Sequence, residues 1–392
     1  MKNNRWLLPE GIEEALPDKA WQLELLRRQL LDLFDSWGYD LVMPPFIEYL
    51  ESLLVATGND LDLQTFKLTD QLTGRMMGVR ADMTPQVARI DARHLDSTAP
   101  SRLCYLGTVL HTRPDGFAGS RSLLQVGAEL YGHAGIESDV EVLSLMLDTL
   151  GQVGIEQPYL DLGHVGIYRA LVAQAGLTRL QEEDLFDALQ RKARPELTAL
   201  LDSMALDDAV AEMLNALAEL NGSTEVMAAA RSAFRAASDE LNAALENLDA
   251  IARLLQQQRP DLRLHYDLAE LRGYNYHTGA VFAAYVPGHG QAIAQGGRYD
   301  GIGEAFGKSR PATGFSTDLR TLALLGGVVN RKQAGILAPA GDDTELQNKI
   351  RSLRASGERV IVALPGQQGK ARDMQCDRQL IKTEQGWIVE TA

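Results

Sequence analysis

The segment 102–132 constrains the fold of this chain more than any other part of its sequence. Two runs of strand-forming residues, 103–110 and 123–131, flank a loop that is rich in Gly, Pro and Arg. This pattern predicts a long antiparallel hairpin. We therefore expect the rest of the chain to be organised around this hairpin.

One face of the second expected strand carries polar side chains. Because side chains alternate along a strand, Gln125, Gly127 and Glu129 point to the same side, with the glycine between a carboxamide and a carboxylate. Such a face suits a ligand that carries an ammonium group or an imidazole N–H, and Gly127 leaves a gap that a ring would fill. A solvated strand face is the alternative interpretation, and this stretch taken alone favours it.

The composition limits the class of protein. A length of 392 residues indicates two or three domains, and 45% hydrophobic with 23% charged residues is typical of a soluble globular protein. The net charge of -15 argues against a broad nucleic-acid surface, because phosphate contacts need clustered Lys and Arg. Cys104 and Cys376 form neither a metal nor a redox motif, which favours a reducing cytoplasm. We expect neither a secretory signal in residues 1–6 nor a membrane span, which needs roughly 20 apolar residues.

The N-terminal third predicts helices and short strands that lead into the hairpin. Leucines at spacings of three and four predict a helix over 19–37, and strand-forming residues follow at 39–43. Alternation over 64–78 predicts a further hairpin. Asp82 and Thr84 then lie where a strand gives way to a helix, and acceptors at such a place most often cap the helix.

The composition changes twice in the second half of the chain. The region 177–258 is rich in Ala and Leu, keeps a helical period, and contains 15 acidic and 7 basic residues. We interpret it as an inserted helical subdomain with a solvated acidic face. The paired glycines of 295–301 indicate a hairpin tip or a close backbone approach. A strand that runs into a helix is expected at 312–320, and a small α/β domain at 331–392.

These segments, taken in this order, resemble the class II histidyl-tRNA synthetases over nearly the whole span 7–325. Each motif is weak alone, but the series is a strong signal. The matching parts are the first class motif around 38–45, the second at 102–132, two histidine-specific signatures at 272–276 and 296–301, and the third motif from Gly314.

The resemblance implies an α+β fold. Residues 1–325 would form a synthetase-like antiparallel sheet flanked by helices, with 177–258 as the inserted helical subdomain and 331–392 as the small C-terminal domain. As in the class, the segment 38–51 would build a dimer interface.

The phosphate-binding positions of this resemblance are altered. An active synthetase places an arginine, followed closely by a glutamate, on the ATP α-phosphate, whereas this chain has His111 there with no acidic residue in the next three positions. A second arginine of the synthetases holds the γ-phosphate, and this chain has Thr321 at that position. Neither an imidazole nor a hydroxyl replaces the bidentate fork of arginine well. Losing one such donor typically costs about 10²–10³ in rate. Arg320 is one place out of register with the second arginine. Adenylation should therefore be feeble or absent, unless Arg113 substitutes for the first arginine by a loop shift.

The amino-acid side of the resembling site is largely kept. Asp82 stands where the synthetases carry a longer glutamate, and His277 where they have a second tyrosine, so either change could weaken histidine binding. The resemblance implies that Asp82, Thr84 and Gln125 hold the ammonium of histidine, Glu129 its imidazole and Arg272 its carboxylate, with Tyr276 and His277 completing the pocket.

A histidine pocket beside a reduced ATP site, with a short C-terminal segment that has no evident basic surface, resembles the regulatory subunits of ATP phosphoribosyltransferase. Members of that family join a short-form catalytic subunit, enable the first step of histidine biosynthesis and confer feedback inhibition by histidine. The resemblance implies a cytoplasmic, non-catalytic dimer without metal, cofactor, nucleic-acid or membrane partner. An active histidyl-tRNA synthetase, or another class II ligase of an amino acid, is the alternative.

Overall fold

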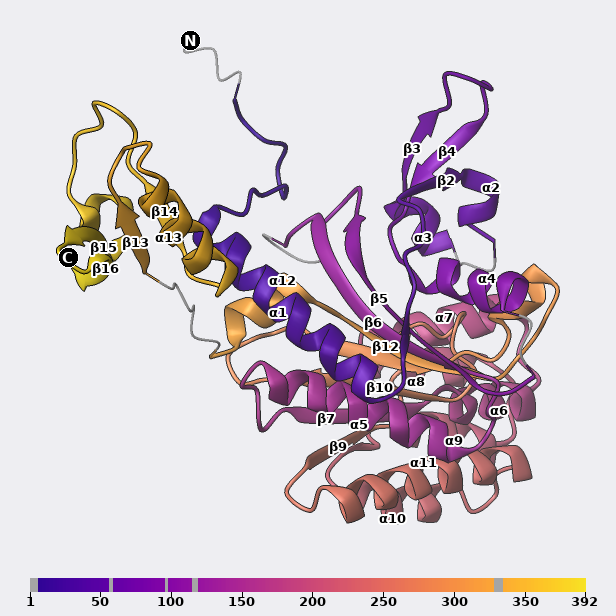
Figure 1. Cartoon of the computed structure of the whole chain (residues 1–392). Coiled ribbons are helices and arrows are strands. Elements are labelled where there is room, and N and C mark those ends of the chain that lie inside the picture. The colour runs from indigo at the N-terminus through magenta and orange to yellow at the C-terminus, as the bar shows by residue number, and fades with distance from the viewer. Residues whose placement is uncertain (1–5, 56–58, 96–97, 115–118, 328–333) are drawn as a thin grey trace, which may run out of the picture. The chain divides into compact units, whose positions relative to one another are not determined.

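The computed structural model describes residues 6–55, 59–95, 98–114, 119–327 and 334–392. The chain divides into two units, Met1–Val328 and Val329–Ala392 (Figure 1). Residues 1–5 and 331–333, at the start of the two expected domains, lie outside the described residues. In the described part of the chain, no helix is both long and apolar enough to span a membrane.

A nine-stranded sheet is the centre of the first unit. The predicted hairpin is confirmed, because β5 and β6 pair antiparallel along their whole lengths. All neighbouring strands of the sheet run antiparallel except the pairs β1–β5 and β7–β9. The order is β1 (Asp40–Leu41), β5 (Ser101–Leu110), β6 (Ser122–Tyr131), β12 (Ala312–Asp318), β11 (Ala294–Arg298), β10 (Ala280–Tyr285), β7 (Tyr159–His164), β9 (Arg263–Asp267) and β8 (Asn221–Gly222).

The strand register places residues in rows that cross this sheet. Directly paired residues share one face, and the next residue along each strand belongs to the opposite face. One face therefore carries the row Tyr105, Gly127, Ser316, Gln295, Ala283, Asp161 and His265, which we call the front row. The adjacent row on the back face contains Ala128, Phe315, Gly296, Phe282, Leu162 and Tyr266.

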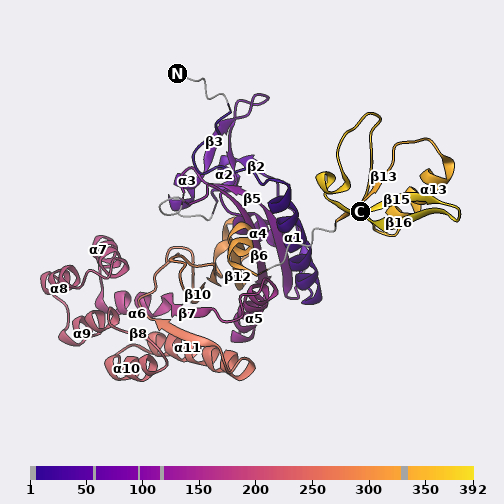
Figure 2. The ribbon, with the colours of Figure 1, turned by 90° about the vertical axis from the view of Figure 1, so that its left-hand side faces the viewer.

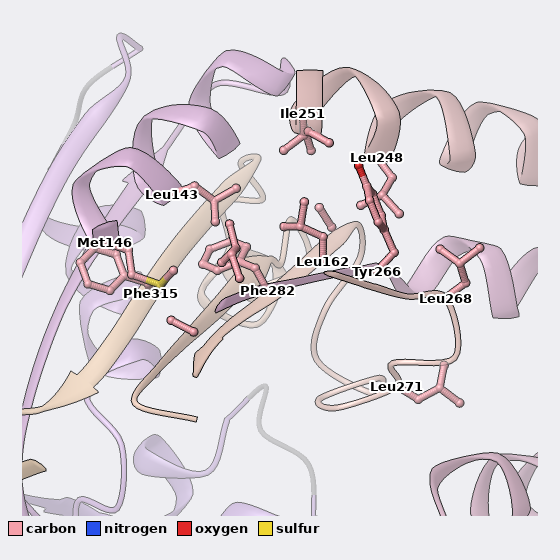
Figure 3. Packing of buried hydrophobic residues seen from close by; sticks show 14 of the residues in the cluster. Leu143, Met146, Leu162, Leu248, Ile251, Tyr266, Leu268, Leu271, Phe282 and Phe315 are labelled. Carbon is pink, nitrogen blue, oxygen red and sulfur yellow. The ribbon is translucent and has the colours of Figure 1, made fainter. Parts of the chain in front are cut away.

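Helices cover the back face of the sheet. Figure 3 shows Leu143 and Met146 of α5 (Ile136–Gln152) beside Phe315 and Phe282, and Leu248 of α11 (Asp239–Gln258) beside Tyr266. The helix predicted near the N-terminus is α1 (Pro17–Ser36), whose Phe34 meets Phe315 edge to face at 6.3 Å. All these side chains are buried in one cluster. Since burying one large apolar side chain contributes about 1.5–3 kcal/mol, this layer holds the sheet in place.

A second, three-stranded sheet precedes the hairpin. Its order is β2 (Ile47–Tyr49), β4 (Met76–Val79) and β3 (Phe66–Thr69), and the β3–β4 pairing confirms the hairpin predicted at 64–78. The helices beside it are α2 (Leu50–Leu53), α3 (Asn59–Gln64) and α4 (Thr84–His94), and the short η1 (Ile302–Phe306) contacts α4.

The region 177–258 is helical, as predicted, but it also adds one strand to the sheet. The two residues of β8 pair antiparallel with β9, so the insertion extends the sheet edge. Figure 2 shows α7 to α10 gathered together at a distance from the small sheet of β2, β3 and β4. The helix α6 (Val165–Ala175) precedes this region, whose own helices are α7 (Arg179–Gln190), α8 (Arg194–Ser203), α9 (Asp208–Leu217), α10 (Glu225–Ala233) and α11.

The glycines of 295–301 do not form a hairpin tip. The paired Gly296 and Gly297 belong to β11, an inner strand between β10 and β12, and Gly301 follows that strand. A Cβ at Gly296 would lie 2.1 Å from the carbonyl oxygen of Gly314, so close strand packing explains this glycine. The strand predicted to run into a helix at 312–320 is confirmed, because β12 leads directly into α12 (Leu319–Leu325).

The second unit is a small α/β domain with its own core. Its four-stranded sheet has the order β14 (Val360–Val362), β13 (Gly335–Ala338), β15 (Cys376–Thr383) and β16 (Gly386–Thr391). The core contains Ile336 and Leu380 of the sheet and Leu346 and Ile350 of α13 (Thr344–Ala355). The short η2 (Ala371–Met374) precedes β15.

Candidate functional site

A cavity of about 200 Å³ lies over the front row of the large sheet. The small residues Ser316 and Ala283 form part of its lining, which leaves the space open above the strands. Six of the seven residues expected to bind histidine line this cavity, namely Asp82, Thr84, Glu129, Arg272, Tyr276 and His277. The seventh, Gln125, lines an adjoining cavity of about 610 Å³ that shares Asp82 and Arg272 with the smaller one.

The floor of the smaller cavity is closed beside Gly127. A Cβ at Gly127 would lie 2.4 Å from both Cζ and the hydroxyl oxygen of Tyr105. The expectation that a ligand ring fills the gap at Gly127 is therefore wrong, because the buried ring of Tyr105, its cross-strand partner, fills it. The glycine is required for packing within the protein.

Glu129 is a buried carboxylate with three hydroxyl donors. Its side chain is only 1% exposed, so the interpretation of this strand face as solvated is wrong. Oε1 accepts from the hydroxyls of Tyr105 at 2.8 Å and Thr84 at 3.0 Å, and Oε2 accepts from the hydroxyl of Tyr299. Burial raises the pKa of Glu129 to about 8, although the hydroxyl donors act in the opposite direction. A polar ligand would meet a carboxylate that titrates near neutral pH.

Asp82 and Gln125 form a second polar group beside Glu129. The Nε2 amide of Gln125 donates to Oδ1 of Asp82 at 2.7 Å, and the backbone N–H of Thr84 donates to the same oxygen at 3.1 Å. The backbone N–H of Met83 donates to Oε1 of Gln125 at 2.9 Å. The N-cap of α4 is Met83 and has no side-chain cap bond, so the helix-capping interpretation is wrong. Asp82 lies one residue earlier, and its bonds to Thr84 and Gln125 fix its carboxylate at the cavity wall.

Arg272 lies at the mouth of both cavities. Its side chain is 47% exposed, and its guanidinium donates to the hydroxyl of Tyr285 at 2.9 Å and to Oε1 of Gln295 at 3.3 Å. A salt bridge of 3.4 Å joins it to Glu270. Tyr285, Gln295 and Glu270 thus position the guanidinium, and about half of the side chain remains exposed to solvent.

Tyr276 and His277 form an aromatic part of the lining of the smaller cavity. The ring of Tyr276 stacks on Tyr299 with centroids 5.0 Å apart, and its hydroxyl is buried without a partner among the described residues. His277 meets Tyr276 edge to face at 5.2 Å and lies against Gly297, where a Cβ would come within 2.9 Å of Nδ1. Burial lowers the pKa of His277 to about 4, so its imidazole is neutral at pH 7.

Four further residues of the site were not predicted from the sequence. Tyr105 and Tyr299 complete the hydrogen bonds of Glu129, and Asp161 and Glu270 line the smaller cavity. Tyr105 could have been found from strand alternation, because it lies opposite Gly127 in the predicted hairpin. Asp161 could not, since only the register across β7, β10, β11 and β12 places it in the front row.

The larger cavity contains the altered ATP-site positions His111 and Thr321. Nε2 of His111 donates to the carbonyl of Ala81 at 2.9 Å, and the hydroxyl of Thr321 donates to Asp318 at 2.9 Å. Both side chains are therefore engaged by the protein itself. Among the described residues that line this cavity, Arg272 is the only Lys or Arg.

The arginines near these two positions in the sequence, Arg113 and Arg320, do not belong to the described lining of the larger cavity. Arg113 is exposed on the loop after β5. Within the described residues, no group of three or more His, Cys, Asp or Glu side chains is arranged to hold a metal ion.

Comparison with known proteins first identifies the class. Residues 11–322 match the sequence model of histidyl-tRNA synthetase. A crystal structure from Bacillus halodurans, described as an ATP phosphoribosyltransferase regulatory subunit/histidyl-tRNA synthetase, superposes with a TM-score of 0.83 at 26% identity and covers 94% of this chain and 96% of that one. The class II histidyl-tRNA synthetase fold implied by the sequence is confirmed.

The C-terminal unit and the curated relatives narrow this class. Residues 333–390 match the C-terminal domain of the ATP phosphoribosyltransferase subunit HisZ. Proteins named ATP phosphoribosyltransferase regulatory subunit are 61% identical in Thioalkalivibrio sulfidiphilus, over 99% of this chain and 98% of that one, and 58% identical in Alkalilimnicola ehrlichii, over 99% and 97%. The chain belongs to the family of ATP phosphoribosyltransferase regulatory subunits. Its role is regulatory rather than catalytic, which fits a place in histidine biosynthesis.

Proposed function

We propose that the chain binds histidine in the smaller cavity and thereby confers feedback inhibition on a catalytic partner. The observation that carries this proposal is the convergence of six predicted residues, from three separate parts of the sequence, on one cavity. A zwitterionic amino acid needs a carboxylate for its ammonium and a cation for its carboxylate. Asp82 and Arg272 supply these two charges in the same lining.

The position of Glu129 supports recognition of the imidazole. Asp82, held by Gln125 and next to Thr84, would receive the ligand ammonium, and Arg272 at the mouth would bind the ligand carboxylate. These contacts leave the side chain of the ligand to extend toward Glu129 and Tyr276. Once ionised, Glu129 accepts a hydrogen bond from an imidazole N–H, which an aliphatic amino acid cannot offer. The pocket would therefore select histidine by its ring.

The larger cavity supports a role without adenylation. An ATP α- or γ-phosphate placed there would find Arg272 at one edge but no arginine at the positions of His111 and Thr321. The active-synthetase alternative therefore has no observation in its favour at these positions. Any catalysis by the assembly would belong to the short-form catalytic subunit of ATP phosphoribosyltransferase, with which we propose that this chain associates in the cytoplasm.

Replacing Glu129 tests the histidine site. A carboxylate that accepts from an N–H in a partly dry pocket contributes about 1.5–3 kcal/mol, so Glu129→Gln should weaken histidine binding about 10- to 100-fold. Titration calorimetry on the purified chain near pH 8.5, where Glu129 is largely ionised, measures this change. Glu246→Gln, an exposed carboxylate on α11, is the matched control and should bind like the unaltered chain.

Inhibition curves on the reconstituted assembly test the regulatory half. Because coupling is reciprocal, the Glu129→Gln assembly should need correspondingly more histidine for inhibition while its uninhibited activity stays the same. An unchanged histidine affinity in Glu129→Gln would place the effector site elsewhere. Phosphoribosyltransferase activity of this chain alone, or histidine-dependent pyrophosphate exchange, would contradict the non-catalytic part of the proposal.

A further inference from the structure

The turn 271–279 carries four of the residues that line the smaller cavity, and it is tightly folded. The carbonyl of Gly273 accepts from the backbone N–H groups of both Tyr276 and His277 at 2.8 Å. Gly273 has a φ of +66°, a left-handed conformation that favours glycine. The N–H of Tyr274 donates to the carbonyl of Leu271 at 2.9 Å. These backbone hydrogen bonds make 271–277 a compact unit, so a shift of one residue would move its neighbours.

Tyr274 anchors the turn in the helices. Its ring lies 5.2 Å from Tyr168 of α6 in an edge-to-face contact and 5.5 Å from Phe186 of α7. Its hydroxyl donates to Oε1 of Glu182 on α7 at 2.8 Å. Aromatic contacts of this kind contribute beyond the area that they bury, and a hydrogen bond to a charged acceptor is stronger than a neutral one. Tyr274 thus ties the ligand-binding turn to α6 and α7.

Arg169 of α6 holds the same turn through its backbone. Its Nη2 donates to the carbonyl of Tyr274 at 2.6 Å and to the carbonyl of His277 at 2.7 Å. Its guanidinium carbon also lies 4.8 Å from the centroid of the Tyr274 ring. The two carbonyls bracket Tyr276, so one side chain of α6 fixes the turn on both sides of a cavity-lining residue.

The opposite side of the turn faces the cavity. Tyr276 stacks on Tyr299, whose hydroxyl donates to Glu129, so the contacts run from the helices through the turn to the buried carboxylate. The hydroxyl of Tyr276 is buried and has no hydrogen-bond partner among the described residues. A ligand that supplied this partner would stabilise one position of the turn over others, which is the differential interaction that a population shift requires.

We propose that Tyr274 and Arg169 are positioning residues that couple occupancy of the smaller cavity to α6 and α7. This inference rests on the proposed binding of histidine. We call the turn seated when Tyr274 lies between α6 and α7. The seated turn presents Tyr276 and His277 to the ligand, and the bound ligand keeps Tyr274 between the two helices. By reciprocity, loosening the helical anchor weakens ligand binding, and binding of the ligand reduces local opening of α7.

Binding measurements on two variants test the anchor. Arg169→Gln removes both ties to the turn carbonyls, and Tyr274→Phe removes only the bond to Glu182 while keeping the ring. If the seated turn is the binding-competent state, its reduced population should raise the Kd for histidine about tenfold in Arg169→Gln and about threefold in Tyr274→Phe. Tyr159→Phe is the matched control, because Arg263 also lies over its ring, at 5.2 Å, and donates to its hydroxyl, but outside both cavities.

Hydrogen exchange on the full chain separates coupling from a merely structural role. Histidine should slow amide exchange in residues 179–190 of the unaltered chain and of Tyr159→Phe. At saturating histidine this protection should be lost in Arg169→Gln and reduced in Tyr274→Phe.

The outcomes distinguish the two proposals. No histidine binding by the unaltered chain would overturn the proposed function, and the coupling with it. Binding by the unaltered chain with no change in α7 exchange, or with an unchanged Kd in Tyr274→Phe and Arg169→Gln, would overturn the coupling alone. A lowered melting temperature with an unchanged Kd would equally contradict it. If Arg169→Gln does not fold, Tyr274→Phe decides.

Discussion

Glu129 determines much of the chemistry of this protein at the scale of single residues. A carboxylate that is 1% exposed would ordinarily be costly, but hydroxyls of Thr84, Tyr105 and Tyr299 satisfy its oxygens. Burial still dominates, and the pKa of Glu129 is raised to about 8. The neutral form is favoured in the folded protein at pH values where an exposed glutamate is ionised.

The stability of the folded chain should depend on pH through Glu129. Its pKa is about 8 in the folded state and 4.5 for the ordinary group, so the favourable contribution is fully present below about pH 4.5 and is lost as the pH rises toward 8. Over this window the free energy of unfolding should fall by up to about 1.4 kcal/mol per pH unit from this group. Urea denaturation between pH 5 and 8 measures the slope, and Glu129→Gln should remove this component. An identical slope in the variant would show that Glu129 does not titrate in this range.

Close packing of β6 against β12 sets the geometry of the site at the scale of elements. Gly314 lies opposite Glu129 in the register, and a Cβ there would come within 1.5 Å of Oε2 of Glu129 and 2.9 Å of the carbonyl of Ala128. The strand can therefore accept only glycine at this position if Glu129 keeps its place. The same contact explains why the third class motif begins with a glycine in this chain.

Gly314→Ala should disturb both stability and ligand binding. Overpacking of a tight interior typically costs about 1–3 kcal/mol, and this contact is closer than most, so we expect a loss of at least about 3 kcal/mol in the free energy of unfolding. Histidine binding should fall below detection in calorimetry, because Glu129 must move. Gly301→Ala is the control, since a Cβ there meets nothing within 4 Å, and it should change the stability by no more than about 0.5 kcal/mol. A Gly314→Ala chain as stable as the control would refute the packing argument.

Apolar side chains gather near the sheet edge at the scale of the whole molecule. Leu41, Met43, Phe46 and Ile47, in the segment 38–51, are 42%, 74%, 39% and 41% exposed. Neighbouring exposed apolar side chains mark interaction surfaces more often than isolated ones do. We therefore propose that this segment builds the dimer expected from the class II resemblance.

Met43→Glu should weaken the dimer. A charge placed in the centre of an apolar interface loses its hydration without gaining a partner, so the variant should shift toward the monomer at micromolar concentration. Light scattering with size-exclusion chromatography measures the mass. Leu324→Glu, at a side chain that is 76% exposed on α12, is the control and should leave the mass unchanged. A monomeric unaltered chain would contradict the proposal.

The sequence alone predicted most of the elements and the residues of the candidate site. Strand alternation located the β5–β6 hairpin and put Gln125 and Glu129 on one face, because side-chain direction in a strand is a local property. The order of the motifs determined the class II fold and the residues expected to bind histidine. The replacements at His111 and Thr321 were equally plain, since they concern residue type and not position in space.

Only the tertiary structure decided how the site is closed. The filling of the space beside Gly127 by Tyr105, and the inner position of β11, follow from strand register across the large sheet. The hydroxyl of Tyr299 reaches Glu129 across 170 residues of sequence. The anchoring of Tyr274 between α6 and α7 is likewise a contact between distant segments. Such contacts depend on how elements pack together, and no local pattern of residues specifies that packing.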